Sequence, residues 1–244
     1  WCTISKIWSK GRKGRKEMRA IQFTKIDFIK TKQQILWILL VIPVVLLFML
    51  RQSSDSPMAL VIFCYALFMA LVFSTTPFGS CQRQETGFLL LLPATTRERI
   101  SGRFLYGLSF MVIAALVGVV GMYLGEMISG TVIEAEIIVP FCMVAFAVCM
   151  VLMALEYVIL YLFGEQQSPN ILSLIRMIPG FVFFFGSMGL IGGAQDDPEA
   201  TAALMEYIDG HLMLIGWCSL AAAFVLFAAA AMLCTAVTKK RDFG

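Results

Sequence analysis

Residues 137–163 read IIVPFCMVAFAVCMVLMALEYVILYLF, an apolar run of 27 residues that holds a single charge, Glu156. An α-helix rises about 1.5 Å per residue, so about 20 apolar residues cross a hydrocarbon core about 30 Å thick. About fifteen Leu, Ile, Val and Phe residues favour insertion of this run by ~6 kcal/mol in total. That sum exceeds the few kcal/mol that one acidic residue costs. The run therefore predicts a membrane-spanning helix, with Glu156 turned toward neighbouring helices or a wet cavity.

Five further runs have the length and hydropathy of a membrane span. The first of them is short and contains Pro43, but Lys32 and Arg51 at its ends can extend toward the interfaces. The chain is 59% hydrophobic and 14% charged, which is too apolar for a soluble domain of this length. We therefore expect an all-α polytopic membrane protein with six transmembrane helices. The predicted spans are 34–50, 58–76, 104–125, 137–163, 174–194 and 212–237.

Basic residues lie almost entirely on one side of these spans. Eighteen of the 19 Lys and Arg residues fall in the N-terminal segment, in the loops after the second and fourth spans, or at the C-terminus. Positively charged flanks stay in the cytoplasm. We therefore expect both ends of the chain to lie in the cytoplasm. We also expect the protein to lie in a plasma membrane, as a multi-pass protein of the bacterial inner membrane. Its basic side suits anionic membrane lipids, and no interleaved aromatic pattern indicates nucleic acid.

The chain before the first span divides into two parts. Residues 1–17 form a basic extension that we expect to be poorly ordered or not native, whereas 18–244 form one transmembrane domain. Phe23, Ile26 and Ile29 recur at helical spacing, and two lysines lie near another side. This pattern favours an amphipathic interfacial helix on the inner leaflet. A plain juxtamembrane basic segment would have the same composition.

The last outer loop carries helix start and stop signals. Asp197 can cap a helix, Pro198 suits its first position, and Gly210 suits the position after its end. We therefore expect a short outer helix that packs on the bundle and is separate from the sixth span.

The connection between the second and third spans has the most specific pattern. Residues 88–92 read FLLLL, and Pro93 stops any helix there. Thr95 and Glu98 form a capping box, so a helix begins there and continues into the third span. Five consecutive apolar residues in a cytoplasmic loop need cover. The membrane interface, the inner end of the bundle and a groove on a partner protein all remain open.

A known family has a similar segment at this place. Glu85…Leu91-Leu92-Pro93-Ala94-Thr95-Thr96-Arg97-Glu98-Arg99-Ile100…Gly102-Arg103 resembles the "E…LPxs/tRxxI…gK/R" segment of ABC-2-type ABC transporter permeases. That segment also lies between the second and third of six spans. The start of the transmembrane domain, MRAIQFTKIDFIKTK, resembles the N-terminal helix of the family.

The resemblance implies a permease subunit that moves an amphipathic peptide, lipid or drug outward by alternating access. Two separate ABC ATPase subunits would bind ATP and Mg, and a second copy or a sibling permease would complete a dimer. The loop at 82–103 would hold a coupling helix. The residues expected to couple it to the ATPase are Glu85, Phe88, Leu92, Pro93, Arg97 and Glu98.

The chain itself shows no catalytic machinery. It lacks a Gly-x-x-x-x-Gly-Lys-Ser/Thr loop for ATP. One histidine and scattered carboxylates supply no catalytic or metal site, so we expect no enzyme activity, cofactor or metal in this chain, and the same shortage argues against a membrane enzyme acting on lipids. Its seven cysteines are scattered and fit small apolar residues without disulfides.

Two intramembrane features have more than one interpretation. Glu156 lines a substrate route or locks two helices, or else it bonds to a nearby Tyr, Ser or backbone group. An ATP-independent carrier with proton coupling through Glu156 is the alternative function, although it predicts polar breaks in mid-membrane that are missing. Gly118, Gly121 and Gly125 permit close helix packing, either within the subunit or against another one.

Overall fold

The computed structural model describes residues 20–29, 31–32, 58–79, 95–129, 135–163, 171–178 and 198–242. Regular structure in these ranges is helical throughout, so the prediction of a helical membrane protein is confirmed for this part of the chain. Residues 20–29 and 171–178 form short helices. The other helices are α3 (Met58–Ser74), α4 (Thr76–Gly79), α6 (Thr96–Ser129), α7 (Ala135–Phe163) and α9 (Pro198–Asp242).

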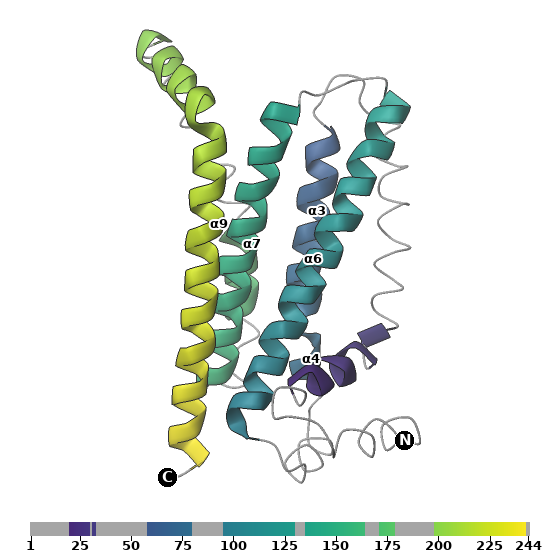
Figure 1. Cartoon of the computed structure of the whole chain (residues 1–244), viewed down its shortest axis with the longest axis vertical. Coiled ribbons are helices and arrows are strands. Elements are labelled where there is room, and N and C mark those ends of the chain that lie inside the picture. Colours follow the sequence, from purple (N-terminus) through teal and green to yellow (C-terminus); the bar gives the residue numbers. More distant parts are fainter. Residues whose placement is uncertain are drawn as a thin grey trace.

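The helices α3, α6, α7 and α9 lie side by side along the longest axis of the molecule (Figure 1). α7 packs most extensively against α9, and α3 packs most extensively against α6. Contacts of α3 with α7 and of α6 with α9 join the two pairs. The helix at 20–29 and α4 lie at the lower end of the view, where α9 also ends (Figure 1). This end of the bundle is the one that the predicted topology places at the cytoplasm.

Helices of spanning length coincide with three of the predicted spans. Among the described residues, Thr96–Gly125, Ile138–Phe163 and Gly210–Lys239 are long and apolar enough to cross a membrane. At about 1.5 Å per residue, the 34 residues of α6 reach about 50 Å, so α6 extends beyond the hydrocarbon core. α3 corresponds to the second predicted span and has a shorter apolar stretch, Ile62–Ser74.

Two other predicted spans cannot be compared in the same way. The first, at 34–50, lies outside the described residues, as does the extension at 1–17. Only the beginning of the fifth, at 174–178, belongs to the described helix at 171–178.

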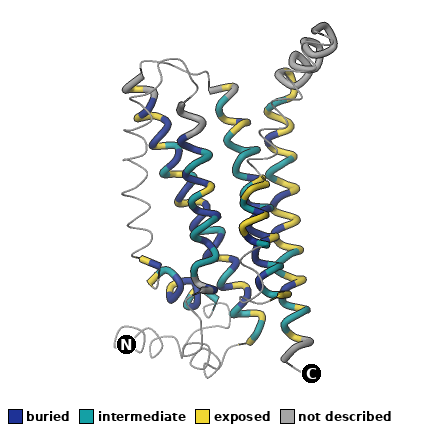
Figure 2. The backbone as a smooth tube through the Cα atoms, turned by 180° about the vertical axis from the view of Figure 1, so that it is seen from behind, coloured by how far each residue is buried: buried dark blue, intermediate teal, exposed yellow. Residues whose placement is uncertain are grey.

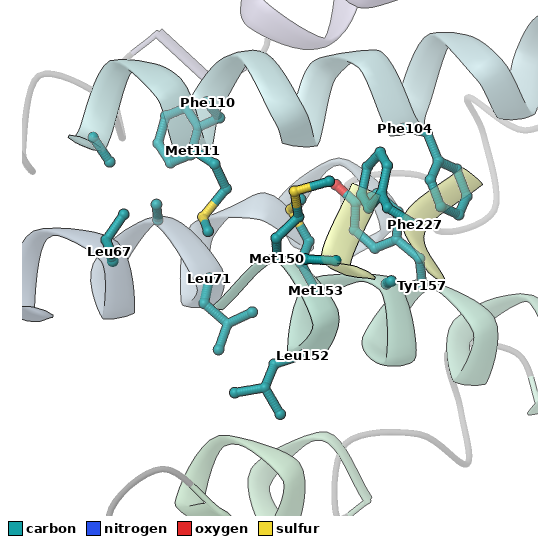
Figure 3. Packing of buried hydrophobic residues seen from close by; sticks show 14 of the residues in the cluster. Leu67, Leu71, Phe104, Phe110, Met111, Met150, Leu152, Met153, Tyr157 and Phe227 are labelled. Atoms are coloured by element: carbon teal, nitrogen blue, oxygen red, sulfur yellow. The ribbon is translucent and has the colours of Figure 1, made fainter. Parts of the chain in front are cut away.

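The core is apolar and rich in methionine. Leu67, Met111, Met150 and Met153 are fully buried between α3, α6 and α7, with Tyr157 beside them (Figure 3). Flexible thioethers fill the irregular gaps that remain between closely packed helices. The outward faces of α6 and α9 carry exposed apolar side chains instead (Figure 2). Such faces suit contact with lipid chains.

Small residues set the distance between paired helices. A Cβ on Gly118 of α6 would lie 2.9 Å from Cδ2 of Phe63 in α3, and one on Gly125 would lie 3.2 Å from Cδ1 of Ile62. Gly121, between them, is buried. The helix that meets Gly118 and Gly125 is therefore α3 of the same chain. Gly216 has the same role in α9, because its Cβ would lie 3.4 Å from Cα of Pro140 in α7.

The expected short outer helix is not a separate element. α9 runs without interruption from Pro198 to Asp242, so it passes through Gly210 into the last span. A glycine inside a helix costs only about 1 kcal/mol relative to alanine, and continuous hydrogen bonding on both sides outweighs that cost. The prediction that Gly210 ends a helix is wrong, because the helix continues through this residue. Gly210 does not adopt the left-handed backbone with which a glycine commonly ends a helix.

Candidate functional site

The capping box predicted at the start of α6 is present. The Thr95 amide donates to Oε2 of Glu98 at 2.8 Å, and the Glu98 amide donates to Oγ1 of Thr95 at 3.3 Å. These bonds satisfy amides that the first helical turn leaves without partners. The carboxylate of Glu98 thus fixes where α6 begins, while Arg97 is exposed beside it. Glu85, Phe88, Leu92 and Pro93 lie outside the described residues.

Three successive hydroxyl groups form hydrogen bonds to backbone carbonyls at the end of the preceding helix, α3. Ser74, Thr75 and Thr76 each donate to the carbonyl three residues earlier, at 2.8, 3.1 and 2.7 Å. These bonds satisfy carbonyls at the helix end, and the chain turns at Thr75 before α4. The sequence analysis missed this break and extended the second span to residue 76. The consecutive Ser-Thr-Thr hydroxyls were the signal for it.

An aromatic cluster holds α4 against the start of α6. The guanidinium carbon of Arg103 in α6 lies 4.3 Å from the ring centroid of Phe78, which is a cation–π distance. The Phe78 ring also packs against Tyr157 and Tyr161 of α7, with centroids 5.1 and 5.5 Å apart. Phe78, shortly before residue 80, and Arg103, in the first turns of α6, therefore belong to the same cluster. We call residues 75–79 and 95–103 the loop root.

Tyr157 connects this root to the core. It is completely buried, and its hydroxyl donates to the Ser74 carbonyl at 3.0 Å. The ring packs edge-on against Phe104, whose own ring contacts Phe227 of α9 (Figure 3). Gly107 leaves room for the hydroxyl, since a Cβ there would lie 2.5 Å from it. One side chain of α7 thereby contacts the end of α3 and two turns of α6.

Glu156, next to Tyr157, belongs to a buried polar group. Its side chain is fully buried, and Oε1 accepts a hydrogen bond from Nε of Arg176 at 2.8 Å. Nη2 of Arg176 donates to Oγ1 of Thr75, also at 2.8 Å. The Arg176 side chain is 23% exposed, and Oε2 of Glu156 is buried without a partner among the described residues. The ion pair joins α7 to the helix at 171–178, and the threonine joins both to the loop root.

Sequence reasoning missed Arg176 as the partner of Glu156. Arg176 is among the basic residues counted with the loop after the fourth predicted span, and the partners expected for the acid are Tyr, Ser or backbone groups. The structural interpretation of Glu156 was therefore wrong in its partner. The signal was available, because Arg176 is flanked by Ile175 and Met177 in an otherwise apolar segment. A charge in such a place needs a buried counter-charge.

The helix at 20–29 is tied to the loop root as well. Oγ1 of Thr24 donates to the Gly102 carbonyl at 2.9 Å, and the Tyr106 hydroxyl donates to Oγ1 of Thr31 at 3.0 Å. A Cβ on Gly102 would lie only 2.7 Å from Cβ of Phe23. The helix therefore rests directly on the backbone of α6.

The amphipathic pattern of that helix holds in part. Phe23 and Ile26 are buried as expected of one face, but Ile29 is 38% exposed. The buried face also contains the polar Thr24 and Asp27. Contact with α6 therefore accounts for part of the amphipathic pattern.

Comparison with known proteins assigns this arrangement to a family. The model of the family described as "ABC-2 family transporter protein" matches residues 23–238. The match includes most of the helix at 20–29, the loop root and nearly all of α9. No match was found among curated proteins or solved structures.

Proposed function

The chain belongs to the ABC-2 transporter family, as a membrane permease component of an ABC transporter, and we propose that it is the transmembrane subunit of an exporter. The family match carries this proposal, because it extends over the whole helical bundle. ATP and Mg bind to two separate ABC ATPase subunits, and a second copy of this chain or a sibling permease completes the transport path. The cargo is an amphipathic peptide, lipid or drug that moves outward by alternating access.

We also propose six spans with both ends in the cytoplasm of a bacterial inner membrane. The helix at 20–29 and the end of α9 lie at the same end of the bundle (Figure 1), which supports this topology. The exposed basic side chains of Lys25 and Lys239 belong to those two elements, and exposed Lys32 lies shortly after the first of them. Anionic headgroups of the inner leaflet attract such side chains.

The ATPase docks on the segment that the loop root holds. Glu85, Phe88, Leu92 and Pro93 contribute to that surface, and Arg97 flanks it on an exposed first turn. Glu98 contributes indirectly, because its carboxylate caps α6 and so directs the first turn toward the partner. The root is joined to α7 through the contact between Phe78 and Tyr157. A movement of the docked ATPase would therefore be transmitted to α7 through these two side chains.

The alternative function, an ATP-independent carrier with Glu156 as the proton-coupling acid, has less support. Membership of an ABC transporter family argues for ATP hydrolysis by a partner. Glu156 is also engaged by Arg176 at 2.8 Å, and a carboxylate held by a guanidinium is poorly suited to release and rebind a proton. If Glu156→Gln abolished proton-driven uptake by vesicles that contain no ATPase, the carrier would be the correct function.

Co-purification tests the docking proposal. The chain is expressed together with a candidate ABC ATPase, taken from the neighbouring reading frame if that frame encodes one. The ATPase retained on the tagged permease is then quantified. Arg97→Glu is expected to lower retention about tenfold, the effect of losing roughly 1.4 kcal/mol of interface energy. Lys239→Glu is the matched control, since it makes the same charge change on an exposed residue at the end of α9.

Two different results would contradict two different parts of the proposal. Full retention by Arg97→Glu would remove this residue from the interface, and failure of the unmodified permease to retain any ATPase would overturn the proposed function. Glu98→Arg is unsuitable for this purpose, because it would also remove the cap of α6.

A further inference from the structure

The Arg176 guanidinium bridges three elements with two hydrogen bonds. Nε donates to Glu156 in α7, and Nη2 donates to Thr75 at the turn between α3 and α4, both at 2.8 Å. Arg176 itself lies in the helix at 171–178. The root of the segment on which we propose that the ATPase docks is therefore linked to two other helices through one planar group.

The arrangement leaves one acceptor unused. Nε and Nη2 share the edge of the guanidinium that commonly binds both oxygens of a carboxylate. Here Thr75 Oγ1 occupies the place of the second oxygen, and Oε2 of Glu156 is buried without a partner among the residues that the structure describes. A second, fully paired arrangement is thus available, in which Nη2 bonds to Oε2 instead.

The exchange would leave no donor unpaired. The Thr75 hydroxyl donates to the Val72 carbonyl at 3.1 Å, so its proton keeps a partner when Arg176 departs. The Glu156–Arg176 ion pair persists in both arrangements, and only one hydrogen bond moves. Two states that differ by one hydrogen bond lie close in free energy, which is the requirement for a small switch.

We propose that Arg176 is a positioning residue that transfers Nη2 from Thr75 to Glu156 as the transporter cycles, and so engages or releases the loop root from α7 and the helix at 171–178. This inference rests on the proposed function, in which the ATPase moves that root. Release does not detach the root entirely, because Tyr157 still bonds to the Ser74 carbonyl and Phe78 still contacts Arg103.

The first test uses the permease alone and measures its Tm in lipid nanodiscs. Thr75→Val removes one acceptor, but Oε2 can replace it, so the expected loss is less than about 2 °C. In a Glu156→Gln background the amide NH2 blocks that replacement. Thr75→Val should then lower the Tm by roughly 3–6 °C, as expected for one buried unpaired donor in a chain of this size.

A matched control corrects for the lost hydroxyl. Thr235 in α9 donates to the Ala231 carbonyl of its own helix at 2.8 Å, so Thr235→Val should have the same small effect in both backgrounds. If Thr75→Val lowered the Tm equally in the unmodified and Glu156→Gln backgrounds, the proposed transfer of the Nη2 hydrogen bond from Thr75 to Glu156 would be wrong. This outcome does not depend on any ATPase.

The second test measures ATP turnover by the complex of permease and ATPase in nanodiscs. Thr75→Val should retain the ATPase but lower turnover about tenfold, the effect of removing one charged hydrogen bond from one of two states. Thr75→Ser should restore it, and Arg176→Lys should not, because an ammonium lacks the planar fork. If the Thr75→Val and Thr235→Val complexes hydrolysed ATP at the same rate, the proposed role of Arg176 in the transport cycle would be wrong. If the unmodified permease retains no ATPase, the proposed function fails, and the Tm comparison still decides the exchange.

Discussion

Replacing Gly107 by alanine should break one of the contacts between the loop root and α7, the hydrogen bond from Tyr157 to Ser74. A Cβ at this position would lie 2.5 Å from the Tyr157 hydroxyl, 2.9 Å from Sδ of Met153 and 3.1 Å from Cζ of Tyr157. Real Cβ contacts are not this short, and the tyrosine ring has little room to move because it is completely buried. The ring must shift, and its bond to the Ser74 carbonyl is lost.

The size of the effect follows from three contributions. Overpacking a tight core costs about 1–3 kcal/mol, and loss of one hydrogen bond costs about 1 kcal/mol more. Alanine in a helix offsets about 1 kcal/mol of this relative to glycine. The net destabilisation is therefore about 1–3 kcal/mol, which corresponds to a Tm lower by about 3–10 °C for a chain of this size.

Gly210→Ala provides the matched control. Gly210 also lies inside a helix, but among the described residues no atom outside its own stretch of helix lies within 4 Å of the position where its Cβ would be. Since no described atom outside its own stretch of helix would contact the added Cβ, the same substitution should raise the Tm by about 2–4 °C through helix propensity. Thermal unfolding followed by tryptophan fluorescence in nanodiscs measures both variants. If Gly107→Ala raised the Tm as much as Gly210→Ala does, the packing of Tyr157 against α6 would be wrong.

Three further variants test other parts of the same end of the bundle. Gly102→Ala should displace the helix at 20–29 from α6, which is measurable as faster amide exchange in that helix, and unchanged exchange would contradict the contact. Thr95→Ala should cost about 1 kcal/mol through loss of the cap, and a Tm equal to that of the unmodified chain would show that the cap is dispensable. Arg176→Leu should cost on the order of 3 kcal/mol, because it leaves a buried carboxylate without its counter-charge. Adding Glu156→Leu should recover most of that loss, and a further fall in Tm would contradict the pairing.

Much of the fold was predictable because the membrane imposes simple local rules. Apolar runs of sufficient length located α3, α6, α7 and the membrane part of α9, since hydrogen-bonded helices are the way that a chain rich in apolar residues crosses lipid. The cap formed by Thr95 and Glu98 was predictable for a similar reason. It depends on two side chains three residues apart, and the structure contains both of its hydrogen bonds.

Features that depend on distant partners were not predictable in this way. Gly210 is a residue type that often follows the end of a helix, but the helical residues on both sides of it form one continuous helix. Gly107 has no unusual neighbours in sequence, and its importance comes from Tyr157, fifty residues later. Arg176 was assigned by its position near a loop, whereas its role depends on Glu156, twenty residues earlier in another helix. Hydropathy describes each residue by itself and gives no information on which distant residue it will contact.

The two kinds of helix contact in this bundle suit different mechanical tasks. Along the bundle, α6 meets α3 and α9 meets α7 through glycine and alanine, with nondirectional apolar packing that tolerates small displacements. At the end that carries the loop root, directional contacts predominate among those described above, including the Tyr157–Ser74 bond and the Glu156–Arg176 ion pair. A hydrogen bond or ion pair resists displacement and is lost once its geometry is disturbed, whereas two apolar helix surfaces can shift slightly relative to each other and stay in contact. An input at the root would therefore move the ends of several helices together, and the apolar interfaces would accommodate that movement across the membrane.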